Sequence, residues 1–204
     1  MKLVLASNNA GKLAELQALL APVGLALVCQ GNLGIPEADE PHLTFLENAL
    51  AKARHAARLA GTAAIADDSG LCVDALSGAP GVRSTRYAQD HGQPKGDAAN
   101  NRVLLERLSA FPEASQRGAR FVCALVAVRS ADDPQPLVAM GRWAGVIAPA
   151  PRGESGFGYD PLLYLPELGQ TVAELSAADK NECSHRGLAA REMLRQMREV
   201  WGLG

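Results

Sequence analysis

Two consecutive aspartates, Asp67 and Asp68, constrain this chain more than any other feature. They follow residues 63–65, an apolar run too short for anything but the end of a buried strand, and they precede Ser69 and Gly70. A partly desolvated carboxylate needs a cation or hydrogen-bond donors. We therefore expect the strand to give way to a turn here, with a positive group beside the acids. A turn with solvated carboxylates would also explain the stretch.

The composition narrows the class of protein. With 204 residues, 48% of them hydrophobic, the chain can form one large core or two closely joined lobes. Its net charge of −2 gives no electrostatic reason to bind a nucleic-acid polymer or an anionic membrane. The longest apolar run, residues 122–128, is far below the ~18 residues that span a bilayer, and the amino-terminal run is too short for a signal peptide. The four cysteines lack C-x-x-C spacing, so we expect reduced thiols in a cytoplasmic protein.

The amino-terminal segment predicts a phosphate site. Residues 2–6 suit a buried strand, and leucines recur at helical spacing from Leu13 onward, so residues 7–12 form a strand-to-helix loop. The unpaired amides of a first helical turn, the helix dipole and Lys12 would favour an anion. This is not a Walker A loop, because the leading glycine is absent and Leu13 follows Lys12. An N-capped helix with a surface lysine is the alternative.

An acidic loop and a helix follow. Residues 31–41 form a loop that includes Glu40, and the capping box from Thr44 to Glu47 opens a helix that runs to about Ala60. Lys52 lies either on a wet surface or in a cleft where Glu40 approaches the central carboxylates. Helical periodicity places the apolar side chains on one face and the polar ones on the other: Leu46, Leu50, Ala53 and Ala57 against Asn48, Lys52 and His55.

The middle of the chain combines strands and loops. Residues 71–73 resume the strand, residues 77–81 make a tight loop, Asp97 caps a helix, and residues 120–129 and 137–147 form an antiparallel hairpin. Residues 153–161 join several glycines to two aromatic rings. Such a segment suits a flat heterocycle that stacks on a ring while the main chain reads its edge, although a plain glycine-rich connection would look the same.

Three cations gather near the start of the last helix. Ser184 is a credible N-cap, but capping does not explain Lys180, His185 and Arg186. The dipole disfavours cations at a helix amino terminus. They therefore indicate an anionic or acceptor-rich partner.

Six motifs, taken together and in order, resemble those of the inosine/xanthosine triphosphate pyrophosphatases, the HAM1-like family. The resemblance covers nearly the whole chain. It implies one α/β domain over residues 1–204, with a long central mixed sheet, flanking helices and two lobes around a nucleotide cleft. The motifs are Ser7-x-Asn9-x-x-Lys12, Thr44-Phe45-x-x-Asn48-Ala49 with Lys52, Ala66-Asp67-Asp68-Ser69-Gly70-Leu71, Gly78-Ala79-Pro80-Gly81, Phe157-Gly158-Tyr159-Asp160-Pro161 and Lys180-x-x-x-Ser184-His185-Arg186-Gly187.

The resemblance also implies an assembly and an activity. The protein would be a homodimer that hydrolyses ITP, dITP and XTP to monophosphate and pyrophosphate with Mg2+, which cleanses the nucleotide pool. Asp68 would activate water and hold magnesium together with Glu40, and Asp67 would support them. The implied phosphate contacts are Ser7, Asn8, Asn9, Ala10, Gly11, Lys12, Lys52 and Ser69. The implied base contacts are Phe157, Gly158, Tyr159, Asp160, Lys180, His185 and Arg186.

Three positions depart from the family pattern: Asn8 and Gln89 stand where glycine is frequent, and Arg83 replaces an apolar or aromatic residue. Transfer of detail is therefore least secure over residues 81–92. Two other classes compete with this interpretation. A Maf-like pyrophosphatase would begin with Ser-Pro-Arg-Arg, which this chain lacks, and a regulatory nucleotide-binding module would have no need for Glu40 and Asp68 together. A phosphatase would release orthophosphate instead.

Overall fold

The structure is a computed structural model that describes residues 2–21 and 24–203, and over these residues it contains seven β-strands and six α-helices. The strands are β1 (Lys2–Leu5), β2 (Ala26–Cys29), β3 (Ala64–Val73), β4 (Gly118–Val128), β5 (Leu137–Ile147), β6 (Leu163–Leu165) and β7 (Gln170–Thr171). The helices are α1 (Ala10–Leu20), α2 (Phe45–Ala60), α3 (Tyr87–Asp90), α4 (Asp97–Arg107), α5 (Ala177–Cys183) and α6 (His185–Trp201). Short 3-10 helices are η2 (Gln30–Leu33), η3 (Asp74–Leu76), η4 (Gly81–Arg86), η5 (Ala114–Gln116) and η6 (Val172–Glu174).

The strands form one sheet in the order β2-β1-β3-β4-β5-β6-β7. β1 runs parallel to β2 and β3, whereas β6 is antiparallel to β5 and β7. The predicted α/β class with a long mixed sheet is confirmed. β4 and β5 are neighbours, and residues 129–136 between them are too few for a parallel crossover, so the predicted hairpin is confirmed as well.

The described chain divides into two compact units. Unit 1 contains the described residues of Met1–Asp68, Cys123–Gly141 and Ser184–Gly204, and unit 2 contains Ser69–Val122 and Arg142–Cys183. β3, β4 and β5 each contribute residues to both units. The single domain with a nucleotide cleft between two lobes stays a prediction.

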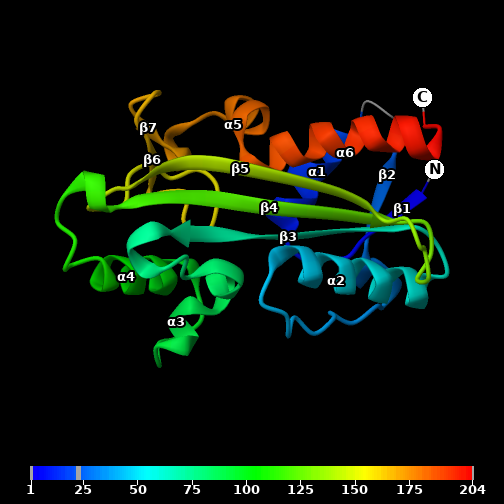
Figure 1. Cartoon of the computed structure of the whole chain (residues 1–204), viewed down its shortest axis with the longest axis horizontal. Helices are drawn as coiled ribbons and strands as arrows, with labels where there is room; N and C mark the ends of the chain where they lie inside the picture. Colours follow the sequence, from blue (N-terminus) through cyan, green and yellow to red (C-terminus); the bar gives the residue numbers. More distant parts are fainter. Residues whose placement is uncertain (1, 22–23, 204) are drawn as a thin grey trace. The chain divides into compact units, whose positions relative to one another are not determined.

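Unit 1 has a core on each face of its strands. Leu3 and Leu5 pack with Met193 and other residues of α1 and α6 on one face, while Val4 packs with Ala53 and other alanines of α2 on the opposite face. Figure 1 shows α1 and α6 on one side of these strands and α2 on the other. This arrangement follows from strand geometry, because successive side chains point to opposite faces.

Helix α2 begins as predicted, and its buried apolar side chains are alanines. Thr44 Oγ1 accepts a hydrogen bond from Glu47 N at 3.2 Å and donates to Glu47 Oε2 at 2.6 Å, which confirms the capping box. Leu46, which the sequence places on the apolar face, is 38% exposed. Small residues allow the helix to lie close to the strands, and the buried apolar side chains of α2 are Ala49, Ala53, Ala56 and Ala57.

Unit 2 has its own core, to which α4 contributes. Val103, Leu104 and Leu108 are buried, as the sequence predicts. The prediction that Asp97 caps α4 is wrong, because the cap position is Gly96 and Asp97 is the first helical residue. No side-chain hydrogen bond caps this helix, so the Asp97 carboxylate is available for another partner.

The predicted turn after Asp68 is also wrong, because β3 continues without interruption from Ala64 to Val73. Gly70 lies within the strand, where a Cβ atom would come within 2.4 Å of Ser84 Oγ and 2.5 Å of Gly81 O. The neighbouring Leu71 N donates to Ser84 Oγ at 2.9 Å. Glycine therefore permits the close approach of η4 rather than a change of direction.

Two sequence expectations concern the whole chain. All four cysteines are free thiols, as their spacing predicts. Within residues 2–21 and 24–203, no helix combines the length and the apolar character needed to cross a membrane.

Candidate active site

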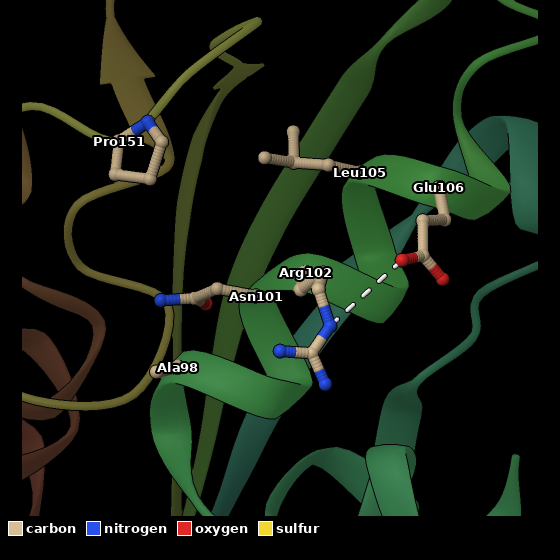
Figure 2. Close-up of a pocket in the computed structure, with 6 residues that line it drawn as sticks. All are labelled: Ala98, Asn101, Arg102, Leu105, Glu106 and Pro151. Atoms are coloured by element: carbon tan, nitrogen blue, oxygen red, sulfur yellow. Dashed lines mark ion pairs between the residues drawn. The ribbon is translucent and has the colours of Figure 1, made fainter. Parts of the chain in front are cut away.

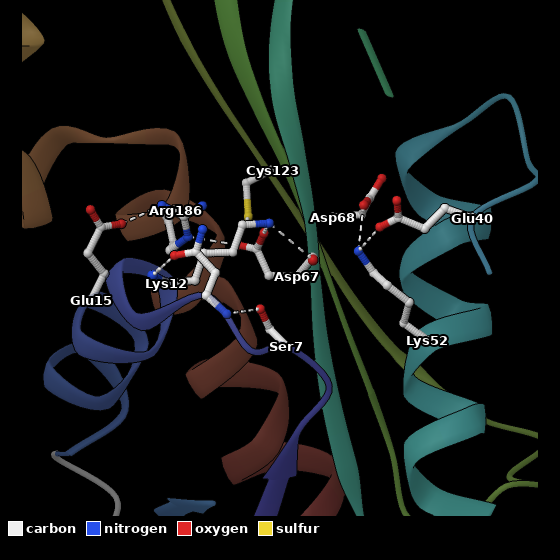
Figure 3. Close-up of polar contacts among 10 residues, drawn as sticks. Ser7, Lys12, Glu15, Glu40, Lys52, Asp67, Asp68, Cys123 and Arg186 are labelled. Atoms are coloured by element: carbon white, nitrogen blue, oxygen red, sulfur yellow. Dashed lines mark hydrogen bonds and ion pairs between the residues drawn. The ribbon is translucent and has the colours of Figure 1, made fainter. Parts of the chain in front are cut away.

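The two central acids lie side by side in β3 and point to opposite faces of the strand (Figure 3). Asp67 Oδ1 lies 2.5 Å from Lys12 Nζ, and its Oδ2 lies 2.7 Å from Arg186 Nε. Asp68 Oδ1 lies 2.6 Å from Lys52 Nζ. Each carboxylate therefore has the positive neighbour that its burial requires, and the two side chains lie on opposite faces of the strand.

Their surroundings move the two pKa values in opposite directions. Burial raises the pKa of Asp67, but Arg186 and Lys12 outweigh it and hold the pKa well below its usual range. For Asp68, burial is the largest influence and raises the pKa despite Lys52. Burial lowers the pKa of Lys52, but Asp68 and Glu40 together raise it above its usual value. Adjacent acids with divergent pKa values are typical of sites that give each acid a different task.

The loop before α1 is held by its own side chains. Ser7 Oγ accepts from Asn9 N at 3.1 Å, and Asn9, the N-cap, accepts from Lys12 N at 2.9 Å. Asn8 Oδ1 accepts from Gly31 N at 3.1 Å, so this departure from the family pattern fastens the loop to η2. The N-capped helix of the alternative interpretation is present, but Lys12 is not a surface lysine, because only 13% of its side chain is exposed.

The start of α1 supplies further candidate groups. Ala10 and Gly11 are its first two residues, where main-chain amides have no partner within the helix. The predicted phosphate residues at the amino-terminal end thus form one continuous segment that ends at Lys12. Lys52 lies on α2, beyond β3 (Figure 3).

Glu40 and Asp68 are joined by one lysine. Lys52 Nζ lies 3.0 Å from Glu40 Oε1 and 2.6 Å from Asp68 Oδ1. The wet-surface interpretation of Lys52 is wrong, because 9% of the residue is exposed. Among the described residues, no group of three or more His, Cys, Asp or Glu is placed to hold a metal. Two carboxylates still match magnesium, which takes one or two from a protein and completes its shell with water and phosphate oxygens.

Arg186 lies deep in unit 1, at the start of α6. Ser184 caps this helix by accepting from Gly187 N at 3.0 Å, and 5% of His185 and 1% of Arg186 are exposed. The expectation that these cations face an anion holds for Arg186, whose guanidinium donates to Asp67 and Glu15. The assignment of His185 and Arg186 to the base stays a prediction.

Sequence reasoning missed two members of this cluster. Glu15 accepts from Arg186 Nη1, and Cys123 Sγ donates to Asp67 Oδ2 at 3.3 Å. Burial beside Asp67 raises the pKa of the Cys123 thiol well above its usual value, which keeps it protonated as a donor. The three-residue spacing of Lys12 and Glu15 in a helix was a usable signal. Nothing near Cys123 in the sequence points to Asp67.

Unit 2 brings together the candidate base residues of the glycine-rich segment. Asp160 Oδ2 accepts from Phe157 N at 2.9 Å and from Lys180 Nζ at 2.7 Å. Lys180 Nζ also lies 4.7 Å from the centre of the Phe157 ring. Gly158 and Tyr159 complete the turn, and Asp160 and Lys180 are buried. A buried ion pair therefore holds one aromatic ring and one stretch of main chain in place.

Ser69, the remaining phosphate candidate, follows Asp68 in β3 and belongs to unit 2. Unit 2 also contains a cavity of about 410 Å3 (Figure 2). None of the predicted site residues lines it. Its lining residues are Ala98, Asn101, Arg102, Leu105, Glu106 and Pro151.

Comparison with known proteins agrees with the resemblance of the motifs. The model of the Ham1 family matches residues 3–196. A dITP/XTP pyrophosphatase of Ralstonia nicotianae is 61% identical and covers 97% of this chain and 96% of its own length. A dITP/XTP pyrophosphatase of Methylibium petroleiphilum is 60% identical, and the match covers 98% of this chain and 99% of that protein.

A solved structure gives the same result. The HAM1 protein from Coxiella burnetii superposes with a TM-score of 0.89 at 44% identity, and the match covers 98% of this chain and 100% of that one. The region matched by the family model contains all of the predicted site residues. This chain belongs to the Ham1 family.

Proposed function

We propose that the chain hydrolyses deaminated purine nucleoside triphosphates, namely ITP, dITP and XTP. The water oxygen forms a bond to the α-phosphorus, the bond from that phosphorus to the bridging oxygen breaks, and pyrophosphate leaves with the monophosphate as the second product. The observation that carries the proposal is the pair of opposed acids in β3, each with its own lysine. The names of the relatives support this substrate class.

Asp68 is the residue that accepts the proton of the attacking water. Its carboxylate is buried, and Lys52 fixes one of its oxygens at 2.6 Å. Asp67 has a different part, since Lys12 and Arg186 engage both of its oxygens. It positions Lys12 and stays ionised, while Asp68 takes part in the chemistry.

Positive charge is required because a triphosphate carries several negative charges that oppose attack. Lys12, Lys52 and the first-turn amides of α1 neutralise that charge, with Ser7, Asn9 and Ser69 as hydrogen-bonding partners. The buried ion pairs hold both lysines in place before substrate arrives. Their task is electrostatic positioning.

Glu40 and Asp68 are the residues that would hold magnesium. Their oxygens flank one ammonium group, and carboxylate oxygen is the ligand type that this ion prefers. When bound, the ion would offset phosphate charge and make water a better nucleophile. A chelator should therefore abolish turnover, and added Mg2+ should restore it.

The base is read by hydrogen-bond donors. Hypoxanthine and xanthine present an acceptor oxygen at the position where adenine presents an amine, so donors select them. Phe157 N and Gly158 N already donate to Asp160 and Asp97. The candidate donors are therefore Tyr159 N and Lys180 Nζ, which carries three N–H groups and gives one to Asp160. His185 and Arg186 are further candidates. A site built on such hydrogen bonds can discriminate by about 10⁴-fold.

A substrate panel tests the proposal. Purified protein is incubated with Mg2+ and the triphosphates of inosine, deoxyinosine, xanthosine, guanosine, adenosine and thymidine, and both products are identified. We expect pyrophosphate and monophosphate from the deaminated purines. Orthophosphate would indicate a phosphatase, a preference for pyrimidines would indicate a Maf-like enzyme, and tight ITP binding without product would indicate a sensor.

The proposal extends to assembly and compartment. We expect a homodimer, which light scattering after gel filtration would measure, and a monomer at working concentration would contradict it. Four free thiols are consistent with a reducing compartment such as the cytoplasm. Fractionation of cells that produce the protein would test this location.

A further inference from the structure

Helix α4 holds both main-chain groups of Gly158. Gly158 N donates to Asp97 Oδ2 at 2.7 Å, and Gly158 O accepts from Asn101 Nδ2 at 3.1 Å. The amide belongs to the peptide before Gly158 and the carbonyl to the peptide after it. Two side chains one helical turn apart therefore fix the orientation of two consecutive peptide planes.

The neighbours of Gly158 are held by residues outside α4. Phe157 N donates to Asp160, and the Tyr159 hydroxyl donates to Ser84 O at 2.8 Å. Gly158 itself has a φ of 63°, in the left-handed region that glycine adopts without strain. Its lack of a side chain leaves only main-chain groups by which it can be held, and α4 binds both.

Asp97 suits this task because of its place in the helix. It is the first residue of α4, the cap Gly96 provides no side chain, and the dipole favours a negative group at this end. Its carboxylate accepts from the loop instead of capping its own helix. A hydrogen bond to an ionised acceptor is stronger than one between neutral groups.

Asn101 makes its bond from a buried position. The residue is 8% exposed, and its Oδ1 has no hydrogen-bond partner among the described residues. A leucine of similar size would avoid this unsatisfied oxygen but would leave Gly158 O without its donor, so the two effects on stability oppose each other. Figure 2 shows the side chain extending from α4 toward the loop, whereas Arg102 turns toward Glu106.

We propose that Asp97 and Asn101 are positioning residues that set the choice of purine base. This inference rests on the proposed function, in which the main chain of residues 157–160 reads the base. Discrimination requires donors placed to within a fraction of an ångström, and α4 fixes the middle of that segment. Loss of either bond should weaken discrimination more than turnover of the preferred substrate.

The experiment compares four full-length variants with the unmodified protein. Asp97→Ala and Asn101→Leu each remove one bond, Asp97→Asn keeps an acceptor oxygen, and Arg102→Ala is the matched control on the same helix. The measurements are kcat and KM for dITP, dGTP and dATP, the melting temperature, and hydrogen exchange of the amides of residues 157–160.

We expect the ratio of kcat/KM for dITP to that for dATP to fall about tenfold in Asp97→Ala and Asn101→Leu, the size of effect that one lost hydrogen bond gives. The Gly158 amide should exchange faster in Asp97→Ala. Asp97→Asn should retain most of the discrimination, and Arg102→Ala all of it. Asn101→Leu should melt close to the temperature of the unmodified protein, because the two opposing effects offset each other, so that selectivity falls without a large loss of stability.

An unchanged ratio in both bond-removing variants would overturn the inference, and so would an equal loss on all substrates together with a lower melting temperature. The proposed function fails separately, if the unmodified protein releases no pyrophosphate from any purine triphosphate. Hydrogen exchange still decides the structural part in that case: unchanged exchange in Asp97→Ala would show that α4 does not hold the loop.

Discussion

The charged cluster of unit 1 and the glycine-rich loop of unit 2 are built in different ways. In unit 1, the cations Lys12, Lys52 and Arg186 face four carboxylates, those of Glu15, Glu40, Asp67 and Asp68. These side chains are themselves the candidate chemistry. In unit 2, Asp160 and Lys180 form a buried pair that holds a ring and a segment of main chain. Neutralising a triphosphate requires ionised side chains, whereas reading a base requires fixed donors and acceptors.

This contrast has a measurable consequence. Changes in the unit 1 cluster should alter turnover of every triphosphate to a similar degree, because all share the same phosphates. Changes in the unit 2 loop should alter the choice among bases. Variants of single residues test whether turnover of all triphosphates and the choice among bases can be changed independently.

The largest effect is expected for Asp68→Asn. An amide cannot accept the proton of the attacking water, so kcat should fall by about 10³-fold or more on dITP and XTP alike, while KM changes little. Steady-state kinetics with pyrophosphate detection measures this. Asp67→Asn is the comparison, and it should lower stability and affinity more than kcat. An active Asp68→Asn protein would mean that the base is misassigned.

The next effect is on the stability of unit 2. Lys180→Met leaves the buried Asp160 carboxylate without its cation, and removing one partner of a buried pair typically costs about 3–5 kcal/mol. Denaturant unfolding measures it. The double variant Lys180→Met/Asp160→Asn should recover much of the stability but not the selectivity for dITP. Recovery of both would mean that the pair serves stability alone.

A smaller effect is expected for Lys12→Met. It removes one positive group from the charged cluster of unit 1, but the Arg186 guanidinium still balances the charge of Asp67. We expect KM to rise about tenfold, and by a similar factor for dITP, XTP and dGTP, as one lost charge-assisted contact predicts. A rise in KM for only one of these triphosphates would contradict the division of tasks between the charged cluster of unit 1 and the glycine-rich loop of unit 2.

The smallest effect is expected outside both clusters. Asp133 accepts from Arg129 N at 2.8 Å and Gln135 N at 2.9 Å, and although burial raises its pKa, these bonds lower it overall. A lowered folded pKa stabilises the fold above the unfolded value of about 3.9, and this contribution is lost as pH falls through the folded value. Asp133→Asn should thus cost about 1 kcal/mol at pH 7 and less in acid.

Denaturant unfolding of Asp133→Asn and of the unmodified protein, at pH 7 and again below pH 4, gives the difference in unfolding free energy at each pH. Turnover and base choice should not change, because Asp133 lies in the β4–β5 connection. A difference in unfolding free energy that grows as pH falls would contradict the expected direction.

The fold is predictable where local signals agree. The capping box of α2, the serine cap of α6 and the hairpin strands follow from spacing and from residue type. The errors have tertiary causes. Local sequence predicts a turn at Gly70, because the reason for this glycine, the close approach of Ser84, lies in a distant segment. Periodicity assigns Leu46 to the apolar face of α2, but it does not tell how deeply each residue of that face is buried, and 38% of Leu46 is exposed.

The candidate site is predictable as a set of residues but not as a set of contacts. The motifs single out Lys12, Asp67 and Arg186, yet Arg186 is 119 positions from Asp67 along the chain. No local pattern encodes that pairing, and the parts of Glu15 and Cys123 depend on it. The use of Asp97 as an acceptor for the loop is hidden for the same reason.

The opposed orientation of Asp67 and Asp68 limits how this enzyme can evolve. Because neighbouring positions of an extended backbone project in contrary directions, neither acid can substitute for its neighbour after a mutation. Inserting or deleting one residue upstream in β3 would turn each aspartate to the other face of the strand. Asp67 would then lie on the face where Asp68 is needed as proton acceptor. We therefore expect the two aspartates to be retained or lost together.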